Sequence, residues 1–134
     1  MDIKKEKVLC QKQWAKNKYL VLSYSSKIYL EIRTYLKQEE VSLEKVDKLI
    51  KQAINLPEDK GQVTNALHHV WGYFKKFATK EEKDNFFEMI EDYHINKTTK
   101  EDLIEEVKKL LEKYPNTYLE QSTFINGGKD ETLA

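Results

Sequence analysis

The residues best spaced for chemistry in this 134-residue chain lie in one stretch, from Asn65 to Lys76. On a helix, steps of four, three and four residues keep side chains on one flank, and these steps join Asn65, His69, Gly72 and Lys76. A glycine inside a helix costs up to about 1 kcal/mol relative to alanine, so Gly72 indicates close approach by another backbone, either a neighbouring helix or a ligand. The stretch therefore predicts either tight helix packing or a binding surface lined by Asn65, His69 and Lys76.

Motifs for metal binding, nucleotide hydrolysis and acyl transfer are missing from the sequence. Two of the three histidines, His68 and His69, are adjacent and point about 100° apart on a helix, so they do not easily share one ion. There is no Cys-x-x-Cys pair, no glycine-rich phosphate loop and no Gly-x-Ser-x-Gly turn. We therefore expect no metal site, no cofactor and no complete catalytic motif.

The single cysteine, Cys10, cannot form a disulfide within the chain, and we expect it to be an inert, half-buried thiol. No segment reaches the roughly 20 apolar residues that span a bilayer. The first residues, Met1 to Gln13, are too charged for the core of a signal peptide. These features predict a cytoplasmic protein that does not contact a membrane.

Helical spacing of apolar residues extends through most of the chain. The stripe that positions the Asn65 to Lys76 stretch consists of Val63, Leu67, Val70, Phe74 and Phe77. Further helix starts and ends are indicated by Ser42 as an N-cap, by Thr79 with Glu82 as a capping box, by Thr99 with Asp102, and by Pro115 as a stop.

These signals predict an all-α fold, a single compact bundle of about six helices with a short extended C-terminal arm. The length suits one domain, and four glycines and two prolines are too few for a turn-rich all-β protein. Tyr118 to Ile125 is expected to form either a short strand or an extended arm. We assign residues 1–125 to the helical domain and residues 126–134, with Gly127 and Gly128, to a flexible tail.

The 23 basic and 23 acidic side chains cancel in total but separate along the chain. Residues 1–80 hold 16 basic and 9 acidic side chains, a balance of +7, whereas residues 81–134 hold 7 basic and 14 acidic ones, a balance of −7. A basic half attracts polyanions. The alternative is that the two halves neutralise each other in the fold.

The same stretch resembles the signature of the YbgA family, a domain of unknown function. The resemblance rests on Asn65-x-Leu67-x-His69-x-x-Gly72-Tyr73-Phe74, on a helix from Glu82-Lys83 to Asp92-Tyr93, and on Lys18-Tyr19-Leu20, Tyr29, Tyr114-Pro115 and Tyr118-Leu119-x-Gln121 in the family's order. It covers Trp14 to Ile125, nearly the whole chain.

In many relatives this domain follows a cysteine-rich desulfidase domain that removes sulfur from thiouracil or from 4-thiouridine in tRNA, and the YbgA-like part is implicated in tRNA binding. The resemblance thus implies tRNA as a ligand and a desulfidase-type protein as a partner. Family histidines are replaced here by Trp14, Tyr24 and Val63, which leaves only His69, and Tyr93-His94-Ile95-Asn96 stands where Tyr-Arg-x-Gly is typical.

Three functions follow as hypotheses. The first is a non-catalytic RNA-binding module, in which lysines and Arg33 bind phosphates and an aromatic ring from Tyr19, Tyr24, Trp71 or Tyr73 stacks on an unpaired base. Its expected binding residues are Lys16, Lys18, Tyr19, Arg33, Asn65, His69, Gly72, Tyr73, Lys75 and Lys76. The second is a protein-interaction or homo-oligomeric helical domain. The third is an enzyme that uses His69 with Tyr73 and a carboxylate supplied from elsewhere in the chain.

Overall fold

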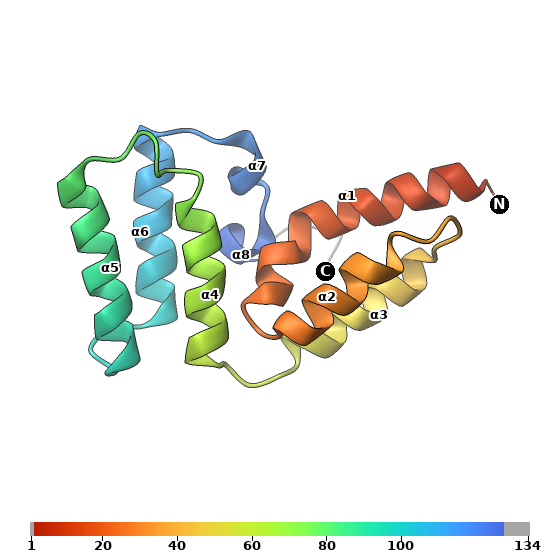
Figure 1. Cartoon of the computed structure of the whole chain (residues 1–134), viewed down its shortest axis with the longest axis horizontal. Coiled ribbons are helices and arrows are strands. Elements are labelled where there is room, and N and C mark those ends of the chain that lie inside the picture. Colours follow the sequence, from red (N-terminus) through yellow and green to blue (C-terminus); the bar gives the residue numbers. More distant parts are fainter. Residues whose placement is uncertain (1, 128–134) are drawn as a thin grey trace.

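The computed structural model of the chain describes residues 2–127, which form eight helices (Figure 1). The six long ones are α1 (Ile3–Leu22), α2 (Ser26–Tyr35), α3 (Leu43–Ile54), α4 (Lys60–Trp71), α5 (Lys80–His94) and α6 (Lys100–Lys113). Two single-turn helices follow, α7 (Thr117–Glu120) and α8 (Thr123–Asn126). No strand is present within residues 2–127, so the prediction of an all-α fold with about six helices is confirmed.

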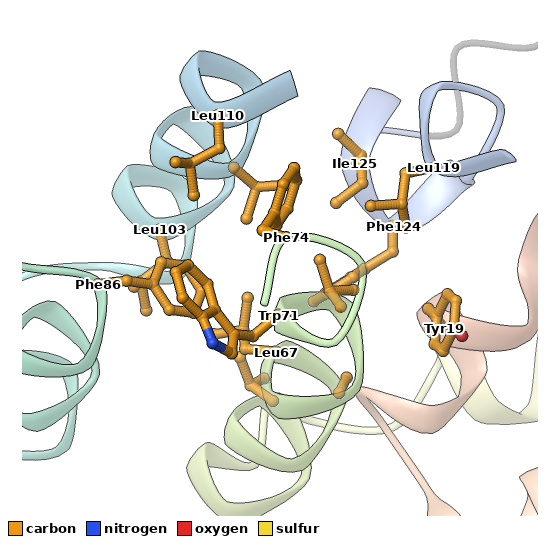
Figure 2. Close-up of a cluster of buried hydrophobic side chains, with 14 of the residues drawn as sticks. Tyr19, Leu67, Trp71, Phe74, Phe86, Leu103, Leu110, Leu119, Phe124 and Ile125 are labelled. Atoms are coloured by element: carbon orange, nitrogen blue, oxygen red, sulfur yellow. The ribbon is translucent and has the colours of Figure 1, made fainter. Parts of the chain in front are cut away.

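The apolar side chains gather in two cores that share α1. The first core lies between α1, α2 and α3, and the second between α4, α5, α6, α8 and the end of α1 (Figures 1 and 2). Cys10 and Val21 of α1 belong to the first core, whereas Tyr19 and Leu22 belong to the second. α1 therefore joins the two halves of the molecule.

The caps predicted from the sequence are formed. The Ser42 hydroxyl accepts the N–H of Lys45 at 3.3 Å, and the Thr99 hydroxyl accepts the N–H of Asp102 at 3.1 Å. Thr79 and Glu82 form the complete capping box, because each side chain accepts the backbone N–H of the other residue. A cap of this kind stabilises a helix by about 1 kcal/mol, so these residues fix where α3, α5 and α6 begin.

Residues 72–78 differ from the prediction, which continued the helical stripe to Phe77. α4 ends at Trp71, and a series of tight turns follows, in which Tyr73 N–H donates to the Val70 carbonyl and Phe77 N–H to the Phe74 carbonyl. Phe74 remains buried in the second core (Figure 2). Phe77 is 64% exposed, so its assignment to the core was wrong, because the regular helical period stops before it.

The C-terminal arm consists of α7 and α8, so the strand alternative for Tyr118 to Ile125 was wrong. Thr123 fastens the arm to α1, since its hydroxyl lies 2.7 Å from Asn17 Oδ1 and 3.2 Å from the Lys16 carbonyl oxygen. Of the segment predicted as a tail, Asn126 ends α8 and Gly127 caps it with a φ of 74°; residues 128–134 lie outside the described part of the chain.

The excess of basic side chains and the excess of acidic ones lie on different helices. Residues 2–54, which form α1 to α3, hold twelve basic and seven acidic side chains, and residues 80–113, which form α5 and α6, hold seven basic and eleven acidic ones. Figure 1 places α5 at one end of the long axis and the start of α1 at the other, with α4 between them. The charge separation in the sequence therefore persists in the folded molecule.

Candidate nucleic-acid interface

Three tyrosine rings from distant parts of the chain meet where α1, α4 and α7 come together. Tyr73, in the turn after α4, stacks on Tyr118 of α7 with the ring centroids 5.9 Å apart and the planes 20° apart. Tyr19 of α1 meets both rings edge-on, at 6.2 Å from Tyr73 and 6.4 Å from Tyr118. Both arrangements are favourable for aromatic pairs. We call these three residues the tyrosine cluster.

A hydrogen bond fixes the inner member of the tyrosine cluster. The hydroxyl oxygens of Tyr19 and Tyr73 lie 2.9 Å apart. Burial, followed by the hydrogen bond to Tyr73, raises the pKa of Tyr19 well above its ordinary value, so this phenol stays neutral. Tyr73 and Tyr118 are only half-buried, so part of each ring reaches the surface.

A cation and an imidazole border the tyrosine cluster. Lys18 Nζ lies 5.3 Å from the ring centroids of both Tyr19 and Tyr118, within the range of a cation–π interaction. The exposed His69 ring lies 6.5 Å from that of Tyr19. Neither side chain forms an ion pair with another of the residues that the structure describes. The site thus offers a positive charge and aromatic surface together.

Four of the predicted binding residues come together here, namely Lys18, Tyr19, His69 and Tyr73. Asn65 is exposed on α4, one turn before His69. Gly72, Lys75 and Lys76 are exposed in the turns that carry Tyr73. Lys16 precedes Tyr19 by about one turn of α1. Its carbonyl oxygen accepts a hydrogen bond from the Thr123 hydroxyl. Arg33 is not part of the cluster, because it is exposed on α2, which packs against α1 and α3.

The expectation that another backbone approaches Gly72 within a helix was wrong. Gly72 is the exposed C-cap of α4, with right-handed backbone angles. A Cβ atom added there would lie 3.1 Å from the carbonyl oxygen of His69, in its own chain. The glycine therefore relieves local crowding where α4 ends, and the alternative of tight helix packing fails.

Two aromatic residues that were expected to stack on bases contact other side chains of the protein instead. Trp71 is buried in the second core, where it stacks on Phe86 with the centroids 5.2 Å apart (Figure 2). It also meets Phe87 edge-on. α4 packs against both α1 and α5, so its buried face is wider than the predicted stripe and includes Trp71. The Tyr24 ring is half-buried, with Lys100 Nζ 5.2 Å from its centroid. Tyr19, buried at 7% exposure, serves as a support for the other two tyrosines.

Sequence reasoning missed two surface aromatic residues. It placed Tyr118 in the arm as a packing residue and Phe77 in the core, and neither spacing indicates a ring at the surface. Tyr118 enters the site only because α7 folds back against the turn after α4 (Figure 1). The one sequence feature that could have pointed to Tyr118 as a site residue was its place in the Tyr118-Leu119-x-Gln121 motif.

A separate pocket of about 580 Å³ opens between the end of α1, α6 and α8, a volume typical of small-molecule sites. Tyr24, Leu20 and Ile104 form part of its wall. Its two lysines are already paired, Lys108 with Glu105 at 3.3 Å and Lys100 with Glu58 at 3.9 Å. None of the predicted binding residues lines it.

Cys10 is more deeply placed than expected, since it is fully buried in the first core. Burial, followed by the nearby carboxylates of Glu6 and Asp47, raises the pKa of its thiol. Within residues 2–127, no three side chains of histidine, cysteine, aspartate or glutamate gather as metal ligands. None of the helices in that range is long and apolar enough to cross a membrane.

A family model described as a protein of unknown function (DUF1722) matches residues 18–127. The match includes the tyrosine cluster and the turns after α4, and it begins within α1. No curated protein and no solved structure matches the chain. The match confirms that an uncharacterised domain family covers nearly all of the chain.

Proposed function

We infer that this chain, which belongs to the DUF1722 family of proteins of unknown function, is a non-catalytic RNA-binding domain with tRNA as its ligand. The observation that carries the proposal is the half-buried Tyr73–Tyr118 stack with Lys18 against it. An aromatic face stacks on an unpaired base of any sequence, and an ammonium group beside it contacts the phosphate.

Lysines next to the tyrosine cluster supply the remaining charge. Lys75 and Lys76 follow Tyr73 by two and three residues, are exposed, and form no ion pair within residues 2–127. Each lysine that meets a phosphate releases a condensed counterion, which makes binding favourable and sensitive to salt. The excess of basic side chains on α1 to α3 extends the positive region beyond the cluster.

The resemblance to the YbgA family supports tRNA in particular. Relatives in which this domain follows a tRNA desulfidase domain place it near thiolated tRNA, and the same association suggests a desulfidase-type protein as a partner and a cytoplasmic location. Trp14, Tyr24 and Val63 replace family histidines, so the proposed contact uses the tyrosines and lysines of this chain instead.

The test is tRNA binding across a salt series by fluorescence anisotropy. In a variant with Lys18→Gln, Lys75→Gln and Lys76→Gln, we expect weaker binding and a log–log salt slope smaller by about 2, since each lost phosphate contact removes about 0.7. The matched control is Lys51→Gln, Lys83→Gln and Lys97→Gln, which removes the same charge from exposed positions on or next to α3 and α5. Wild-type protein without salt-sensitive tRNA binding would contradict the proposal.

Exposed apolar side chains near the start of α1 favour protein interaction as a second candidate function. Ile3, Val8 and Leu9 are exposed, and Val8 and Leu9 line a shallow groove of about 330 Å³ with Lys4 and Lys5. Clustered apolar side chains on a surface mark contact sites. Light scattering at high concentration tests the homodimer version: wild type is expected to dimerise and a Val8→Ser, Leu9→Ser variant to stay monomeric, whereas a monomeric wild type removes this version.

An enzymatic role for His69 has less support. The only interaction of its ring with residues 2–127 is the contact with Tyr19, so no carboxylate orients the imidazole as a general base. Full RNA binding together with unchanged cellular function in a His69→Ala variant would exclude the enzymatic alternative.

A further inference from the structure

Phe77 is the most exposed large apolar side chain within residues 2–127, at 64%. Its ring lies parallel to that of Tyr114, at the end of α6, with the centroids 6.3 Å apart and the planes 22° apart. No other aromatic ring among the described residues contacts the Phe77 ring. The pair therefore presents an open aromatic face to solvent.

A hydrogen bond to Glu82 holds Tyr114 in place beside Phe77. Its hydroxyl donates to Glu82 Oε1 at 2.7 Å, and Lys113 Nζ donates to Glu82 Oε2 at 3.0 Å. Glu82 Oε1 also accepts the N–H of Thr79 in the capping box. Both carboxylate oxygens are thus bound to neighbours, so the α5 N-terminus fixes the orientation of Tyr114.

Positive charge surrounds the Phe77–Tyr114 pair. Lys75 and Lys76 precede Phe77 directly, and Lys113 Nζ lies 5.4 Å from the centroid of the Tyr114 ring. Lys113 is paired with Glu82, but Lys75 and Lys76 are unpaired within the described range. Protein–protein interfaces are depleted of lysine near their apolar centre. Nucleic-acid interfaces instead use lysines to neutralise phosphates.

The pair and the tyrosine cluster share one short segment of chain. Phe77 follows Tyr73 by four residues in the series of tight turns after α4. Phe74, between them, is buried and anchors these turns in the second core (Figure 2). Lys75 and Lys76 thus lie in the chain between two aromatic surfaces.

We propose that Phe77 and Tyr114 form a second stacking site for an unpaired base of RNA, with Lys75 and Lys76 at the phosphates between this base and one on the tyrosine cluster. This inference rests on the proposed RNA-binding function and extends its contact surface to α6. Single-stranded RNA, whose bases are free to stack, is then the preferred ligand over a duplex.

The experiment compares Phe77→Leu and Phe77→Trp with wild type on tRNA, on a single-stranded RNA of about 12 nucleotides and on its duplex, a length within the site sizes of single-strand binders. Phe77→Leu keeps an apolar side chain but removes the ring, so single-strand affinity is expected to fall about fivefold or more. Its salt slope is expected to stay unchanged, because no charge is lost. Phe77→Trp is expected to bind at least as tightly as wild type.

Ile95→Ala is the matched control, since Ile95 is 61% exposed at the opposite end of α5 and is expected to be without effect. If wild type binds RNA and Phe77→Leu binds it equally well, the second stacking site is wrong and the RNA-binding proposal stands. An equal loss of duplex and single-strand affinity also overturns the site. If wild type binds none of the three RNAs, both proposals fall.

Discussion

The hydroxyl oxygens of Tyr19 and Tyr73 lie 2.9 Å apart and link α1 to the turn after α4 across 54 residues of sequence. Tyr19 has almost no access to water, so Tyr73 is the partner that satisfies its hydroxyl. The same Tyr73 ring stacks on Tyr118 at the surface. A core hydrogen bond and the candidate binding surface therefore depend on one side chain.

Tyr73→Phe separates these two roles. It removes the partner of the Tyr19 hydroxyl but keeps the ring, so we expect the free energy of unfolding to fall by about 1 kcal/mol while RNA binding is retained. Urea unfolding measures the first quantity. In the double variant Tyr19→Phe, Tyr73→Phe no hydroxyl is left unpaired, and part of the stability is expected to return. Strictly additive losses would show that the two hydroxyls do not interact.

The stability of the α5 start is expected to depend on pH through Glu82. Hydrogen bonds from Thr79, Tyr114 and Lys113 lower the pKa of Glu82 from 4.5 to about 2. Because the folded state holds the carboxylate ionised, its stabilising contribution is complete above pH 4.5 and is lost as the pH falls from there toward 2. Thermal unfolding between pH 7 and pH 3 is expected to show a smaller acid-induced decrease in Glu82→Gln than in wild type. Equal decreases in both proteins would contradict this.

Local signals in the sequence predicted the helices well because they depend on neighbouring residues. The predicted N-caps Ser42, Thr79 and Thr99 do cap helices, because their hydroxyls accept backbone N–H groups of the first turn. Pro115 follows the end of α6, as predicted. The positions of Gly72 and Phe77 were misjudged for one shared reason. A periodic pattern does not show where a helix stops, and α4 stops at Trp71.

The candidate site was only partly predictable for a different physical reason. Lys18, Tyr19, His69 and Tyr73 lie on segments that the resemblance already indicated, and the fold brings them together. Tyr118 and Tyr114 join the surface through packing between distant segments. The resemblance includes both residues, but no spacing within the sequence determines such contacts, so their place at the surface required the structure.

Phe74 and Phe77 offer a contrast between core and surface within one turn. Phe74 is fully buried among α4, α6 and α8 (Figure 2), so Phe74→Ala is expected to cost about 3 to 5 kcal/mol of unfolding free energy. Phe77→Ala is expected to change stability by about 0.5 kcal/mol or less, because the ring is already in solvent. Urea unfolding of both variants decides this. A large loss in Phe77→Ala would mean that its ring stabilises the fold.

Ser122 and Thr123 provide a test of how the arm is fastened to α1. Both hydroxyls are buried, but the Thr123 hydroxyl bonds to Asn17 whereas Ser122 Oγ has no hydrogen-bond partner in the described structure. Thr123→Val keeps the shape and leaves Asn17 Oδ1 buried without a donor, so we expect it to lower the free energy of unfolding by about 1 to 3 kcal/mol. Ser122→Ala removes a hydroxyl that makes no bond and is expected to leave stability unchanged or slightly higher. Amide hydrogen exchange in α8 is expected to quicken only in Thr123→Val. Equal losses in both variants would show that Ser122 also anchors the arm.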